Sequence, residues 1–98
     1  MLGEYYLKAG ADLDAMEDEA KVWRRKAEKA DSPLMRQYYE EIQGIENKCD
    51  AARIALNACV IGGKNVSVEE KEGLERAIDS VREALNRLAS RAKDVLGD

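Results

Sequence analysis

Apolar residues recur along most of the chain in steps of alternately three and four residues, within three long segments. The apolar positions are Leu2, Tyr6, Ala9, Leu13, Met16, Ala20, Trp23, Ala27 and Ala30; then Met35, Tyr38, Ile42, Ile45, Cys49, Ala52, Leu56 and Cys59; then Leu74, Ile78, Val81, Leu85, Leu88, Ala92 and Val95. This average spacing of 3.5 residues is typical of helices that pack along one seam in a coiled coil. The pattern therefore predicts helices and no strands.

Two breaks divide this pattern into three predicted helices. Their expected bounds are about 4–30, 33–61 and 68–96. At the first break, ADSP, an aspartate or serine can cap the second helix, and Pro33 fits in its first turn. At the second break, GGKNVSVEE, the two glycines can end the second helix. Ser67 and Glu70 then match a capping box at the start of the third helix.

The short turns make consecutive helices antiparallel neighbours. We expect an all-α fold, an antiparallel up-down-up three-helix coiled-coil bundle that forms a single domain over residues 1–98. A chain of 98 residues can bury one continuous core, and it is too short for two. In a competing arrangement, one helix stays unpaired until a second chain supplies its partner.

The stretch KVWRRKAEKA, residues 21–30, combines the only tryptophan with the only run of three consecutive basic residues. Such a run could hold a phosphate or a stacked base outside the protein. Trp23 falls on the apolar seam, however, where a large ring among alanines fills the volume of a narrow bundle. Basic residues near the end of a helix also complement its macrodipole. We therefore expect Trp23 in the core and the basic residues on its rim.

The seam pattern breaks at residues 51–61, AARIALNACVI, where the predicted helix is apolar on nearly all sides. A helix with one buried side does not need isoleucines on its other side, and contiguous exposed apolar patches mark interfaces. In the expected bundle, this helix end lies beside the start of the first helix. We expect self-association there; the alternatives are a different partner protein, or a loop or N-terminal segment folded over the patch. The predicted interface residues are Tyr5, Leu7, Ile54, Ala58 and Ile61.

The composition argues against catalysis and metal binding. The chain contains no histidine, which removes the commonest general base and metal ligand. Cys49 and Cys59, if they share a helix, lie about 15 Å apart along its axis and cannot bond to each other. We expect buried, reduced thiols, with an interchain disulfide or a two-chain metal site as the alternatives. The expectation is no enzymatic activity, no cofactor and no small-molecule substrate.

The charge pattern limits the possible partners. With 16 basic and 20 acidic residues, the net charge of −4 argues against sequence-independent binding of nucleic acid, which needs a positive field. The longest nearly apolar stretch, IALNACVIGG, is too short and too interrupted to cross a bilayer. No basic segment followed by an apolar run begins the chain, so we expect no signal peptide and a cytoplasmic protein.

The expected function is a non-enzymatic protein–protein interaction or assembly module that self-associates, as a homodimer, through the apolar end of the bundle. One alternative is an acidic regulatory protein that blocks a basic partner through Asp12, Asp14, Glu17, Asp18 and Glu19. A second alternative is nucleic-acid binding through Arg24, Arg25, Lys26 and Lys29. Electrostatic binding weakens steeply with ionic strength and apolar association does not, so salt dependence separates these functions.

Overall fold

The computed structural model describes residues 2–29 and 35–96, with side chains over 3–29 and 37–92. It contains the helices α1 (Leu2–Lys29), α2 (Met35–Gly62) and α3 (Val68–Leu96), and a short 3₁₀ helix, η1 (Gly63–Asn65). The prediction of an all-α fold is confirmed, and the described residues include no strand. Coiled-coil packing of these helices stays a prediction. None of the described helices is long and apolar enough to cross a membrane.

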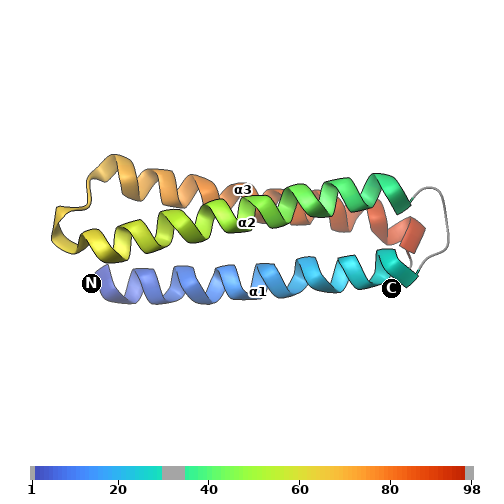
Figure 1. Ribbon diagram of the computed structural model, residues 1–98, viewed down its shortest axis with the longest axis horizontal. Coiled ribbons are helices and arrows are strands. Elements are labelled where there is room, and N and C mark those ends of the chain that lie inside the picture. The colour runs from blue at the N-terminus through green and yellow to red at the C-terminus, as the bar shows by residue number, and fades with distance from the viewer. Residues whose placement is uncertain (1, 30–34, 97–98) are drawn as a thin grey trace.

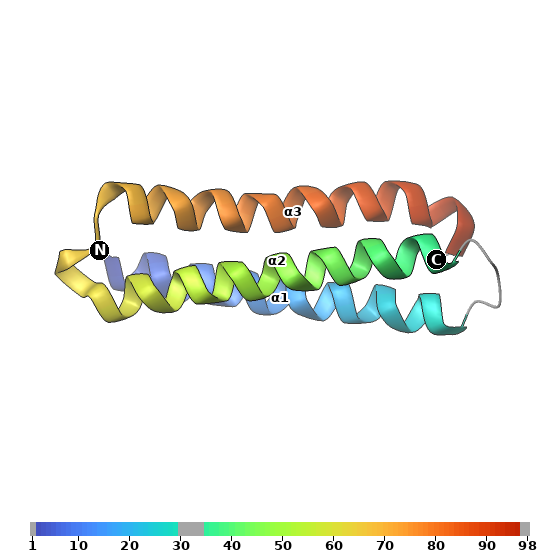
Figure 2. The same cartoon turned by 45° about the horizontal axis from the view of Figure 1, so that its top comes forward.

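The three helices lie side by side along one axis and form a rod of 50 × 18 × 18 Å. Two views at 45° to each other show the same arrangement, with the start of α1, the end of α2 and the start of α3 at one end of the rod (Figures 1 and 2). This places the apolar segment of α2 beside the first turns of α1.

The core follows the apolar seam of each helix. Its buried side chains are Ala9, Leu13, Met16, Ala20, Trp23 and Ala27 from α1; Ile42, Ile45, Cys49, Ala52, Leu56 and Cys59 from α2; and Leu74, Ile78, Val81, Ala84, Leu85, Leu88 and Ala92 from α3. Seam residues Tyr6 and Tyr38 are half-buried and pack against this core. Ala84, which the seam pattern omits, is 7% exposed. The prediction that Trp23 belongs to the core is confirmed.

The turn between α2 and α3 follows the predicted stop and start signals. Gly63 has a φ of +54°, a left-handed conformation that favours glycine, and it begins η1 just after α2. At Gly62, a Cβ atom would lie 2.7 Å from Cγ2 of Val66, so this position also needs glycine. The capping box is confirmed: the backbone N–H of Glu70 donates to Ser67 Oγ at 3.1 Å, and that of Ser67 donates to Glu70 Oε1 at 3.4 Å.

The helix bounds differ slightly from those expected. α1 begins at Leu2, two residues before the expected start, and α2 continues one residue further than expected, to Gly62. The difference at Gly62 arises because the left-handed residue that stops α2 is the second glycine of the pair. The predicted cap around Pro33 lies outside the described residues.

Candidate functional site

Exposed apolar side chains gather at one end of the rod. Among residues 3–29 and 37–92, the large apolar residues with exposed side chains are Leu7 (76%), Val22 (45%), Ile54 (70%), Val60 (55%), Ile61 (86%) and Val68 (69%). Within this set, only Val22 lies away from the end where α1 begins and α2 finishes. Isolated exposed apolar residues are ordinary on protein surfaces, whereas a gathered set calls for a physical reason. We call Leu7, Ile54, Ala58, Val60 and Ile61 the apolar end surface.

The α2 part of this surface lies opposite the core. Ile54, Ala58 and Ile61 follow steps of four and three residues along the outer face of α2, and Ala58 is exposed like the two isoleucines. The seam residues Leu56 and Cys59 of the same turns are 5% and 1% exposed. α2 is therefore apolar on its outer and its inner side over this stretch.

Charge is absent from the outer face of this part of α2. No charged residue occurs from Ile54 to Gly63, although 37% of the chain is charged. The nearest preceding charge, Arg53, turns toward α1 and donates to Asp14 Oδ1 and Glu17 Oε1, each at 2.6 Å. An uncharged face of this kind gains no hydration energy of ionised groups by staying exposed to water.

A groove between the start of α1 and the end of α2 is lined mainly by apolar residues and glycines, with Lys64 as its charged member. It has a volume of about 450 Å³, and Leu7 and Val60 form part of its apolar lining. Gly3 leaves the groove open, since a Cβ atom there would meet nothing within 4 Å. The ring of Tyr6 also lines it, and burial, followed by the neighbouring Cys59 thiol, raises the pKa of the Tyr6 hydroxyl. The groove extends the apolar end surface from α2 across to α1.

Of the five predicted interface residues, Leu7, Ile54, Ala58 and Ile61 are exposed, whereas Tyr5 is half-buried. The Tyr5 hydroxyl donates to Glu75 Oε1 at 3.2 Å, so this side chain faces α3. Its ring is half-buried against the core and contacts the Tyr6 ring edge-on at 5.6 Å between centroids. Sequence reasoning missed Val60, for which the signal was its place within the uncharged stretch before Gly62.

Two residues of the basic run, Arg24 and Lys26, contact other side chains of the same molecule. Arg24 donates to both carboxylate oxygens of Glu46, and its guanidinium lies 5.9 Å from the centre of the Tyr39 ring. The ammonium of Lys26 lies 4.7 Å from the centre of the Trp23 ring, which is only 9% exposed. These contacts give the run a structural role at the α1–α2 boundary.

Three of the five acidic residues of α1 in the proposed binding face form ion pairs with arginines of the other two helices. Asp14 and Glu17 accept from Arg53, as described above, and Asp12 lies 3.8 Å from a guanidinium nitrogen of Arg82 on α3. Asp18 and Glu19 are exposed. The five acidic residues therefore do not form one surface with a common orientation.

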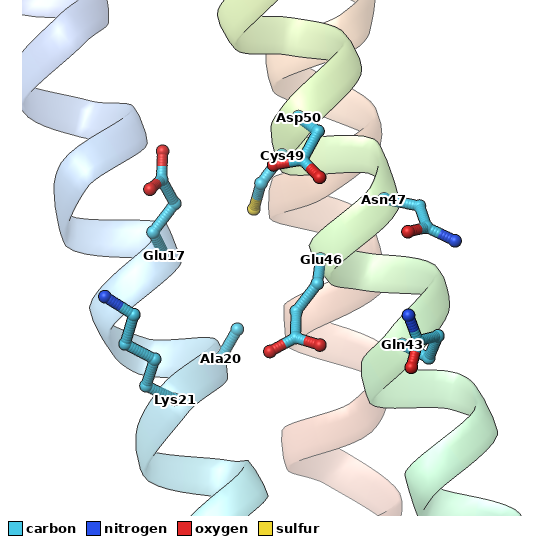
Figure 3. A pocket seen from close by; sticks show the side chains of 8 residues that line it. All are labelled: Glu17, Ala20, Lys21, Gln43, Glu46, Asn47, Cys49 and Asp50. Atoms are coloured by element: carbon cyan, nitrogen blue, oxygen red, sulfur yellow. The ribbon is translucent and has the colours of Figure 1, made fainter.

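A second groove between α1 and α2, about 300 Å³ in volume, is bordered mostly by charged and amide residues (Figure 3). The close view shows the Cys49 thiol directed from α2 toward α1, with the Glu17 and Glu46 carboxylates near the groove. Burial, followed by the charges of Glu17, Asp50 and Glu46, raises the pKa of Cys49 to about 11. Such a thiol stays protonated at neutral pH and is a poor nucleophile. This groove therefore offers no chemistry that requires a thiolate.

The free energy of unfolding is expected to fall as the pH rises from about 9 to about 11. The ordinary pKa of a cysteine thiol is 9.0, and that of Cys49 in the folded protein is about 11. Between pH 9 and pH 11, the unfolded chain therefore binds fewer protons than the folded chain. The raised pKa of Tyr5, about 12 instead of 10.0, acts in the same direction at higher pH. Urea unfolding at several pH values would measure the decline.

The Cys49→Ala variant is the control for this pH dependence. Its stability at neutral pH can differ from that of the parent, so the comparison concerns the slope against pH and not the absolute value. The slope between about pH 9 and 11 is expected to be shallower in the variant. Equal slopes in the two proteins would show that Cys49 does not cause the decline.

No protein-family profile, curated protein or solved structure matches this chain. The apolar end surface and the polar contacts around it are therefore the features of the molecule that bear on its function.

Proposed function

We propose that the protein is a non-enzymatic assembly module that binds a second copy of itself through the apolar end surface. The observation that carries the proposal is that Leu7, Ile54, Val60 and Ile61 are 55–86% exposed at one end of the rod, and that no charged residue occurs from Ile54 to Gly63. Uncharged surfaces with exposed aliphatic side chains favour association with a similar surface, because water is released from both.

The free energy gained by burying this apolar area is of the same order as the entropic cost of forming a dimer. Complete burial of a Leu, Ile or Val side chain contributes about 1.5–3 kcal/mol. Because each copy would cover four such side chains, a dimer would gain on the order of 10 kcal/mol. The loss of translational and rotational freedom opposes association by about 4–15 kcal/mol, so the two effects are of similar size.

The total accessible surface of this elongated rod is larger than that of a compact monomer of the same mass. A compact monomer of 10.9 kDa is expected to expose about 5,600 Å². This rod exposes 6607 Å². The excess of about 1,000 Å² is slightly larger than the roughly 800 Å² that each partner contributes to an interface of standard size. Self-association would thus bring the exposed surface per chain toward the value for a compact protein.

We also infer that the helices pack as an antiparallel up-down-up coiled coil. Arg24 of α1 pairs with Glu46 of α2, while Glu17, one heptad earlier, pairs with Arg53, one heptad later. This inverse order is expected at flanking positions of antiparallel helices. Between α2 and α3, Glu41 pairs with Arg91, while the thiol of Cys59, later in α2, donates to the backbone carbonyl of Glu70, earlier in α3.

Internal ion pairs weaken the two alternative functions. An acidic partner-binding face would need Asp14 and Glu17, whose carboxylates accept from Arg53. A nucleic-acid surface would need Arg24, whose guanidinium donates through Nε and Nη2 to the carboxylate of Glu46. A foreign partner would have to break these contacts before gaining its own.

Light scattering in reducing buffer tests the proposal. The parent is expected to have about twice the chain mass of 10.9 kDa at micromolar concentration. The Ile54→Glu, Ile61→Glu variant is expected to be a helical monomer, because two carboxylates per copy cannot be buried without partners. The matched control is Val22→Glu, which changes an exposed apolar residue outside the surface and should leave the dimer intact. A parent that remains monomeric up to millimolar concentration would contradict the proposal.

A further inference from the structure

We propose that the two copies meet across a two-fold axis at Ala58, with their α2 helices antiparallel, so that the rods overlap only at their apolar ends. This geometry depends on the self-association proposed above and specifies its symmetry, its centre and its length. The two rods then extend each other instead of lying side by side.

The order of side chains on the outer face of α2 is self-complementary about Ala58. Ile54 lies four residues before it and Ile61 three residues after it, and both are largely exposed. A two-fold axis that reverses one helix places Ile54 of one copy against Ile61 of the other, twice over. The small side chain at the centre lets the two helix backbones approach, and the isoleucines pack on either side of it.

The charges that border this stripe favour antiparallel over parallel helices. Asp50 is exposed eight residues before Ala58, and Lys64 is exposed six residues after it. Lys64 belongs to η1, just beyond the end of α2. In the antiparallel pair, Asp50 of one copy therefore lies at the same end of the contact as Lys64 of the other. In a parallel pair, each charge would lie beside its own equivalent and repel it. The contact between copies is thus apolar at its centre, with an opposite-charge pair at each end.

The position of Ala58 determines the shape of the assembly. It lies four residues, about 6 Å, before the end of α2 in a rod 50 Å long. A two-fold axis there leaves about 40 Å of each rod on its own side, so the dimer spans about 80 Å. Rods paired along their whole length would instead measure little more than one rod. The proposed dimer displays the opposite, Trp23-containing end of each bundle at its two extremities.

Disulfide trapping and small-angle X-ray scattering test this geometry. An Ala58→Cys variant under mild oxidation is expected to form a covalent dimer in high yield, because equivalent positions meet at the axis. The buried Cys49 and Cys59 should not compete. The matched control is Asn47→Cys, an exposed position on the same helix that lies about 16 Å from the axis and should not cross-link. Scattering should give a maximum dimension of about 80 Å.

Charge exchange provides an independent measurement. Asp50→Lys alone and Lys64→Asp alone should each weaken the dimer about fivefold, and the double variant should recover the parent affinity. Cross-linking at position 47 as strong as at 58 would show parallel helices and overturn the geometry. So would a dimer with a maximum dimension near one rod length, whether or not Ala58→Cys cross-links. Either of those results leaves the self-association intact, whereas a monomeric parent overturns both proposals.

Discussion

Replacing Leu13 with alanine is expected to lower the free energy of unfolding by about 2–5 kcal/mol. Leu13 lies in the middle of α1, is fully buried, and belongs to the set of largest enclosed side chains in the core. The rod is only 18 Å across, so few core side chains surround Leu13 at its level. These neighbours cannot move far into the space left by the missing atoms. Urea unfolding followed by circular dichroism measures the loss.

Leu7 provides the matched control for Leu13, because it is the same residue type on the same helix and is 76% exposed. In the Ile54→Glu, Ile61→Glu background, where association does not contribute, Leu7→Ala should change the stability by less than about 0.5 kcal/mol. In the parent, the same change should weaken the dimer. Equal destabilisation by Leu13→Ala and Leu7→Ala in the monomeric background would contradict the assignment of α1 faces.

Replacing Trp23 with alanine is expected to destabilise the protein by about 3–5 kcal/mol. Its indole fills the core between Ala20 and Ala27 and also supports the ammonium of Lys26. The fluorescence of this single tryptophan provides a second readout, because its emission should shift to longer wavelength when urea exposes the ring. The Trp23→Phe variant, which retains a ring, should lose less stability than Trp23→Ala.

The adjacent residue supplies the control for Trp23. Val22 is 45% exposed, and Val22→Ala should alter the stability by less than about 0.5 kcal/mol. The pair also tests the role of KVWRRKAEKA. If Trp23→Ala left the stability unchanged and abolished retention on an RNA or DNA column, the ring would be a base-stacking group and its placement in the core would be wrong.

The site was less predictable than the helices. Ile54, Ala58 and Ile61 could be identified from sequence because they break the seam pattern on a helix whose opposite side is already apolar. Tyr5 and Leu7 could not be distinguished, since both lie off the seam in the first turns of α1. In the structure, Tyr5 faces Glu75 of α3, and Leu7 lies beside Val60 of α2. The rotation of α1 about its own axis determines which of its side chains face α2 and which face α3.

By itself, the sequence determined the features that depend on near neighbours along the chain. The three apolar seams, the glycines that end α2 and the capping box of Ser67 and Glu70 need contacts within only a few residues. The burial of Trp23 follows from the same seam, because a residue on the apolar stripe of a helix can lower its free energy only by facing another helix.

Only the tertiary structure decided which side chains meet between helices. The pairing of Arg53 with Asp14 and Glu17, which withdraws those charges from any partner, depends on the axial alignment of α1 with α2. Ala84 is buried off the seam for a similar reason, since burial depends on how closely two helices approach. Contacts of this kind depend on the rotation and offset of whole helices, and these result from the packing of all the core side chains together.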